Sequence, residues 1–157
     1  MYRSLSKENP SAYQSDVAMT LNNLANLYSG DNRSKEAEQA YDEALAIRRS
    51  LSKENPSAYQ SDVASTLNNL AILYSDDNRL PEAEQAYDEA LEIYRSLSKE
   101  NPSAYGIYLA QTLIMGVYLL KQPKENLTEA RAVLERFKGG HQADRLLSKI
   151  KAMEEEK

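Results

Sequence analysis

Apolar and polar residues alternate along the chain with the period of an α-helix. From Val17 to Tyr28, apolar side chains recur every three or four residues, and a second set with the same spacing runs from Ala37 to Leu51. Residues 29–33, between the two sets, are rich in Gly, Asp and Asn, as is typical of a turn. Because no segment shows the two-residue period of a strand, the pattern predicts an all-α fold.

This two-helix pattern repeats every 46 residues. The string SLSKENPSAY occurs at residues 4–13, 50–59 and 96–105, and residues 11–56 and 57–102 differ at only seven positions. A period between roughly 20 and 50 residues is the signature of stacked helical or strand units. We therefore expect a single domain, residues 1–157, made of five parts. They are the tail of a preceding repeat helix (1–10), repeat 1 (11–56), repeat 2 (57–102), a divergent repeat 3 (103–138) and a C-terminal capping helix (139–157).

Small and aromatic residues within each repeat suggest how the helices pack. We expect Ser11 to cap the first helix after the Asn-Pro pair that ends the preceding one. Ala25 and Ala44 allow two helices to approach closely, and Tyr28 and Tyr41 are expected to fill the gaps between them. One such pair cannot bury both of its faces, so stability should come from neighbouring pairs.

These residues resemble the tetratricopeptide repeat (TPR) family. The string TLNNLANLY at residues 20–28 is similar to the long-period repeats of the kinesin-light-chain type. The period of 46 departs from the basic family repeat of about 34 residues. The resemblance implies an α-solenoid of antiparallel helix pairs that serves as a protein–protein interaction scaffold. The positions that carry it are Leu24-Ala25, Tyr28, Ala37, Tyr41 and Ala44-Leu45, repeated as Leu70-Ala71, Tyr74, Ala83, Tyr87 and Ala90-Leu91.

The resemblance also places a peptide-binding groove on the concave face lined by the first helices. An Asn amide both donates and accepts hydrogen bonds, so a row of them can bind the backbone of a peptide or partner helix. The alternative is that these amides are merely solvated and were retained by duplication. The expected groove residues are Met19, Asn22, Asn23, Asn26, Ser65, Asn68, Asn69, Ile72 and Gln111.

One subclass of the family is not expected. TPR domains that clamp the C-terminal carboxylate of chaperones combine Asn with several Lys or Arg on successive first helices. Asn22, Asn26 and Asn69 stand at corresponding positions here, with Gln111 and Met115, but the cations are missing. Without them a carboxylate in the groove gains little.

Composition excludes most other classes of function. The chain has no Cys and a single His, His141, so we expect neither a metal site nor a cofactor, and no enzyme activity. The net charge is −5, which argues against a nucleic-acid partner. No apolar run approaches the roughly 18 residues of a membrane span, and no signal-peptide pattern opens the chain. We expect a cytoplasmic protein that does not bind membranes.

The first residues suggest a second possible function. Residues 1–9 match the tail of a second helix, so part of the apolar face around Val17 and Leu21 is expected to stay exposed. Either the chain is cut from a longer array or another copy stacks on this end. The alternative to a scaffold is therefore a self-assembly module whose repeats stack or swap between copies, giving a homo-oligomer.

Overall fold

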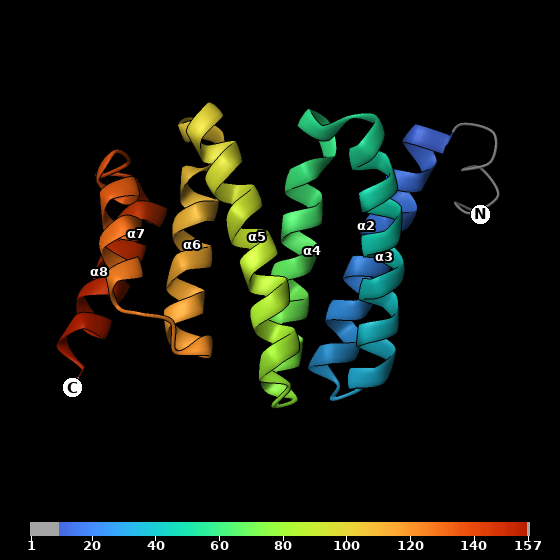
Figure 1. Ribbon diagram of the computed structural model, residues 1–157, viewed down its shortest axis with the longest axis horizontal. Helices are drawn as coiled ribbons and strands as arrows, with labels where there is room; N and C mark the ends of the chain where they lie inside the picture. Colours follow the sequence, from blue (N-terminus) through green and yellow to red (C-terminus); the bar gives the residue numbers. More distant parts are fainter. Residues whose placement is uncertain (1–9, 157) are drawn as a thin grey trace. The chain divides into compact units, whose positions relative to one another are not determined.

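The computed structural model describes residues 10–156, which form seven α-helices and no strand (Figure 1). The all-α prediction is confirmed. Helices α2 to α5 are each 21 residues long, so two helices with their short connections account for the 46-residue period. The helices are α2 (Pro10–Gly30), α3 (Ser34–Glu54), α4 (Pro56–Asp76), α5 (Leu80–Glu100), α6 (Pro102–Leu120), α7 (Glu125–Glu135) and α8 (His141–Glu155).

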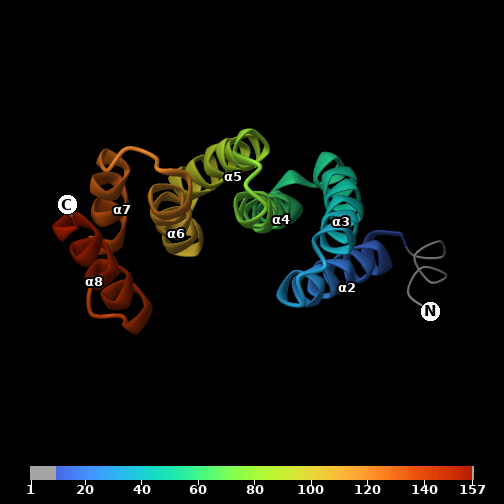
Figure 2. The ribbon, with the colours of Figure 1, turned by 90° about the horizontal axis from the view of Figure 1, so that it is seen from below.

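The helices belong to two compact units that divide within α5, between Ala86 and Tyr87. In the first unit, α3 packs against both α2 and α4, and consecutive helices run antiparallel (Figures 1 and 2). In the second unit, α7 packs against both α6 and α8. Each unit therefore contains the helix pairs that the repeat predicts. The predicted division into five parts remains a prediction.

Asparagine and proline, rather than serine, mark the helix starts. Pro56 and Pro102 occupy the first helical turn, where the missing N–H removes no hydrogen bond. Asn101 is the residue before α6, and its side chain accepts a hydrogen bond from the backbone N–H of Ala104 at 3.2 Å. Ser11, expected to be a cap, lies inside α2 instead.

The tight turn between the two helices of a repeat is the same in both regular copies. Asn32 and Asn78 have φ values of 61° and 59°, a left-handed conformation that Asn adopts more readily than most residues. The guanidinium of Arg33 lies 4.5 Å from the ring centroid of Tyr28, and the second copy repeats this contact at the same distance. The turn chemistry is therefore part of the duplicated unit.

The core of the first unit is built from small residues facing larger ones. Ala25, Ala37 and Ala44 are fully buried, which lets α2 and α3 approach closely. Val17 and Leu21 pack with Ala44 and are buried too, so the part of the surrounding apolar face that stays exposed does not include these two side chains. Their side chains point into the α2–α3 pair rather than away from it.

The junction from repeat 1 to repeat 2 is polar. Arg48 of α3 is nearly buried, and its Nη1 donates to Oγ1 of Thr66 on α4 at 2.7 Å. The same guanidinium approaches the backbone oxygen of Asp62 at 3.5 Å. Thr66 in turn donates to the Asp62 carbonyl at 3.1 Å.

The junction from repeat 2 to repeat 3 is aromatic. Tyr94 stands 46 residues after Arg48, and Tyr108 stands 46 residues after Asp62. The two tyrosine rings stack, with centroids 5.9 Å apart and an interplanar angle of 17°. The position of Arg48 and Tyr94 therefore takes part in both junctions, with different chemistry in each.

In the second unit α6 forms the centre, and Gly116 on this helix lies directly against the ring of Tyr87 on α5. A Cβ at Gly116 would overlap the ring of Tyr87, which is fully buried. Any larger residue at this position would displace the ring. Gly116 therefore fixes how closely α5 approaches α6 within this unit.

The apolar character of α6 corrects one sequence-based statement. Its 19 residues are long and apolar enough, by length and composition, to cross a membrane, and half of that window is buried in the fold. Leu109, Leu113 and Leu120 are among its buried side chains. Because α7 and α8 pack against this helix, we assign it to the core of the second unit.

The last helix is tied to the loop before α7. Lys124 Nζ donates to the backbone oxygens of Met153 at 3.2 Å and Glu156 at 2.8 Å, which satisfies carbonyls that the end of α8 leaves unpaired. Arg131 of α7 pairs with Glu154 at 2.5 Å. These contacts hold α8 against α7 along its C-terminal half.

Candidate functional site

Two of the expected groove residues meet across neighbouring repeats. Asn22 on α2 and Asn69 on α4 are both half-buried, and Asn69 Nδ2 donates to Asn22 Oδ1 at 3.3 Å. Asn23 is exposed beside them. The amides of α2 and α4 therefore lie side by side, as a shared binding surface requires.

A further expected groove residue, Asn26, is already hydrogen-bonded within its own repeat. The hydroxyl of Tyr41 on α3 donates to Oδ1 of Asn26. Burial raises the pKa of Tyr41, so the phenol stays protonated and remains a donor over the physiological range. The Asn26 side chain keeps its amide nitrogen for another partner.

The apolar members of the set differ between the two repeats. Met19 is 52% exposed on α2, and Ile72 is 38% exposed on α4. Ser65 and Asn68 are half-buried. The first unit thus presents amides with exposed apolar side chains on either side of them, and we call Met19, Asn22, Asn23, Asn69 and Ile72 the amide surface.

Gln111 belongs to the second unit, where it lines a pocket of about 340 Å³ between α6 and α8. Arg145 and Lys149 of α8 line the same pocket, and Lys149 Nζ lies 5.5 Å from the ring centroid of Tyr118. Arg145 and Lys149 were not predicted from the sequence, because cations were expected only on the first helices of the repeats. Their spacing of four residues on one helix was the available signal.

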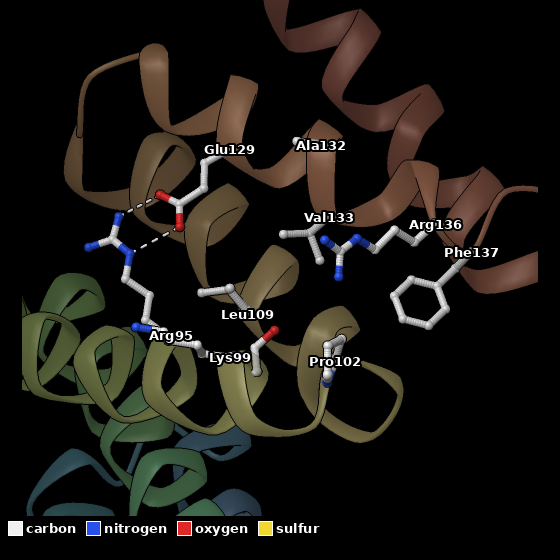
Figure 3. Close-up of a pocket in the computed structure, with 10 residues that line it drawn as sticks. Arg95, Lys99, Pro102, Leu109, Glu129, Ala132, Val133, Arg136 and Phe137 are labelled. Carbon is white, nitrogen blue, oxygen red and sulfur yellow. Dashed lines mark hydrogen bonds and ion pairs between the residues drawn. The ribbon is translucent and has the colours of Figure 1, made fainter.

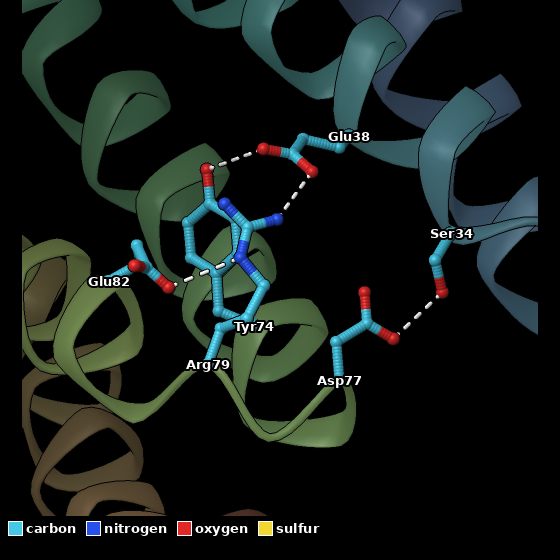
Figure 4. A network of polar contacts seen from close by, with 6 residues as sticks. All are labelled: Ser34, Glu38, Tyr74, Asp77, Arg79 and Glu82. Carbon is cyan, nitrogen blue, oxygen red and sulfur yellow. Dashed lines mark hydrogen bonds and ion pairs between the residues drawn. The ribbon is translucent and has the colours of Figure 1, made fainter.

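A polar network joins α3 to the turn between α4 and α5 (Figure 4). Glu38 accepts from Arg79 Nη1 at 2.7 Å and from the hydroxyl of Tyr74 at 3.4 Å. Arg79 also pairs with Glu82 at 3.1 Å, and Ser34 donates to Asp77 at 2.9 Å. Arg79 thus forms ion pairs with Glu38 of α3 and Glu82 of α5. Because these contacts join helices of two repeats, we assign the network to the stability of the repeat junction.

Burial, together with the neighbouring charges of Asp42 and Glu38, raises the pKa of Tyr74 to about 12. The hydrogen bond to Glu38 raises the pKa of the Arg79 guanidinium. Burial also raises the pKa of Asp42. The network therefore keeps Tyr74 neutral and Arg79 charged throughout the physiological range.

One face of α2 is open although its duplicate on α4 is covered. Leu24 and Leu27 are 38% and 68% exposed, whereas the equivalent Leu70 and Leu73 are 2% and 3% exposed. Thr20 is exposed as well, while its duplicate is the Thr66 that Arg48 contacts. We call Thr20, Leu24 and Leu27 the α2 outer face.

Within residues 10–156, no group of three or more His, Asp or Glu side chains is arranged to hold a metal ion. His141 is exposed at the first residue of α8.

Comparison with known proteins agrees with the helical repeat. The family model described as tetratricopeptide repeat matches residues 17–57 and 63–102, just over half of the chain. The crystal structure of BtubC (BKLC) from P. vanneervenii is similar, with a TM-score of 0.65 and 24% sequence identity. The match covers 88% of this chain and 54% of that one, so the chain spans about half the length of BtubC. No curated protein matches the chain.

Proposed function

The chain belongs to the tetratricopeptide repeat family, and from this premise we propose that it binds an extended peptide or a partner helix on the amide surface. Repeats of this family are in general protein-interaction or scaffold modules. Typical members of the family are non-catalytic. The proposal adds a location for binding and the residues that carry it.

The observation that supports the proposal is the pairing of Asn22 with Asn69 between exposed apolar side chains. Asn in a helix interior lowers the stability of the helix by several tenths of a kcal/mol relative to Ala. Its amide can nevertheless bond the N–H or C=O of a peptide without reading that peptide's side chains. Met19 and Ile72 offer the adjacent apolar contact that adds affinity.

The test begins with affinity capture of partners from a host lysate, followed by calorimetry with the partner identified. The double variant Asn23→Ala/Asn69→Ala should weaken binding at least tenfold, because two hydrogen-bonding groups leave the amide surface. The matched control is Gln39→Ala/Gln85→Ala, which removes two exposed amides from the second helices. Equal affinity for both double variants, with unchanged circular dichroism, would reject the amide surface as the site.

A second candidate function, self-assembly, is supported by the α2 outer face. In the duplicate on α4, the same three residue types are buried, and α3 contributes Arg48 to them. The structure within the first unit thus contains the type of helix that fits this face. We propose that a second copy covers it by exchange, in which the α3 helix of that copy leaves its own α4 and places Arg48 against Thr20.

The two candidates are separated by light scattering between about 5 and 500 µM. Self-assembly through the α2 outer face predicts a mass that rises with concentration and stays monomeric for Leu27→Lys. The Asn23→Ala/Asn69→Ala variant should assemble like the wild type. A strict monomer at every concentration rejects self-assembly and leaves the scaffold proposal untouched.

A further inference from the structure

A second cleft lies in the second unit, between α5 and α7, with α6 as its floor (Figure 3). It has a volume of about 480 Å³, within the range of roughly 300–1,000 Å³ typical of ligand sites. Its floor residue on α6 is Leu109, whereas the pocket at Gln111 uses the opposite side of that helix. The two sites therefore face different directions.

Apolar side chains form the floor and one wall of this cleft. Leu109 is almost fully buried. Val133 of α7 and Phe137, in the turn after α7, are half-buried and line the same cleft. A Cβ at Gly106 would lie 2.9 Å from the Phe137 ring and 3.2 Å from Val133, so glycine allows α7 to seat both side chains on α6. The result is an aromatic and aliphatic surface that solvent still reaches.

Positive charge surrounds that apolar floor. Arg95 and Glu129 form a two-point ion pair, with N···O distances of 3.0 and 2.6 Å, at one end of the cleft (Figure 3). The side chains of Lys99 and Arg136 line the cleft. Within residues 10–156 neither of these two has an ion-pair partner, so their charges are available to a ligand.

The lining residues fix the length of the site. Glu129 on α7 and Arg136, the residue directly after α7, are seven residues apart, a rise of about 10 Å. An extended chain rises about 3.3 Å per residue, so the cleft spans about three residues. Three residues supply one apolar side chain for the floor and one or two side chains for the charged rim.

We propose that this cleft binds an acidic peptide segment of a partner protein, in which a Glu or Asp lies next to Leu or Phe. Carboxylates of the segment pair with Lys99 and with Arg136, each of which supplies charge-assisted hydrogen bonds. The neighbouring apolar side chain covers Leu109 and Phe137. The cleft takes an anionic and apolar segment, and none of its lining residues belongs to the amide surface.

The test uses a defined probe, an N-acetylated and C-amidated hexapeptide in which Glu alternates with Leu or Phe. Both ends are blocked, so no terminal carboxylate or amine contributes. Calorimetry at 50 mM salt measures affinity, and amide and methyl NMR shifts locate the peptide. We expect shifts at Val133 and Phe137, at least tenfold weaker binding when the peptide's Glu residues are Gln, and weaker binding at 500 mM salt.

Matched variants separate this site from a general effect of charge. Lys99→Gln/Arg136→Gln should weaken binding of the hexapeptide at least tenfold. Lys35→Gln/Lys53→Gln, which removes the same charge from exposed positions that line none of these pockets, should not. Arg145→Gln/Lys149→Gln should also leave binding unchanged, because those cations line the pocket between α6 and α8.

Three results would overturn the proposal: no binding at millimolar peptide, equal affinity for the Gln peptide, or loss of binding only in Arg145→Gln/Lys149→Gln. All variants exchange exposed or half-exposed polar groups, and circular dichroism checks that each is folded. A failure here does not affect the amide surface, whose test uses Asn23→Ala/Asn69→Ala.

Discussion

The duplicated leucines Leu27 and Leu73 offer a direct test of how the repeats stabilise one another. They occupy the same position in near-identical helices, yet Leu27 is 68% exposed and Leu73 is 3% exposed. Replacing Leu73 with Ala removes three carbon atoms from the core, worth about 2.4 kcal/mol at about 0.8 kcal/mol each. The cavity left behind raises the loss to about 3–5 kcal/mol.

The same change at Leu27 should cost far less. Because about a third of that side chain is covered, we expect a loss of about 0.8 kcal/mol or less. Urea unfolding followed by far-UV circular dichroism gives both values. With a slope of about 2 kcal/mol per molar urea, Leu73→Ala should lower the midpoint by about 1.5–2.5 M, and Leu27→Ala by less than about 0.5 M.

The protein concentration must stay near 5 µM, since a second copy on the α2 outer face would bury Leu27. Equal losses in the two variants under monomeric conditions would refute the reasoning. Such a result would mean that stability does not follow from contact between neighbouring repeats, contrary to the behaviour expected of stacked units.

Two further predictions concern packing and pH. Gly116→Ala should destabilise the protein by about 1–3 kcal/mol, because the new methyl group meets the buried Tyr87 ring, whereas Gly30→Ala, with open space around it, should be neutral or slightly stabilising in the same urea assay. The raised pKa of Tyr74, about 12 in the folded protein against 10 unfolded, favours the protonated phenol that donates to Glu38. Its contribution to stability is therefore fully present below pH 10 and is lost as the pH rises from 10 to 12. Tyr74→Phe should flatten the fall in urea midpoint between pH 10 and 12, and an unchanged slope would contradict this assignment.

The repeat itself could be predicted from the sequence because the relevant information is local. Spacing of apolar residues sets the helices, and the turn at Asn32 has its own chemical signature. The capping residue was mistaken for Ser11, because serine and asparagine are both good caps and only the backbone path distinguishes them. The proline after each asparagine was the better guide.

Exposure could not be predicted from the repeat, since identical residues have different neighbours. Leu24 and Leu70 share their local sequence, and only the presence of α3 beside α4 distinguishes them. The shortness of residues 1–9 predicts that part of the apolar face around Val17 and Leu21 stays exposed. These two side chains are buried because they pack with Ala44 of α3. A single repeat cannot show which of its faces is covered by the next.

The cationic pockets were missed for a related reason. Arg145 and Lys149 lie on α8, outside the regular repeats, so comparison of repeat positions does not bring them next to Gln111. Lys99 and Arg136 are 37 positions apart in the chain and meet only through the packing of α5 and α7 on α6. Sites formed by several helices require the tertiary structure.

Arg48 and Asp62 in the first junction are replaced by Tyr94 and Tyr108 at the equivalent positions of the second, so the two junctions are not interchangeable. A second copy of residues 57–102 inserted after the first would set a tyrosine against an aspartate, so it would match neither of the two existing joints. A longer protein, produced in evolution or by design, would therefore need matching substitutions on both helices of the new junction. Repeats that are nearly identical in sequence therefore differ in the residues with which they contact their neighbours.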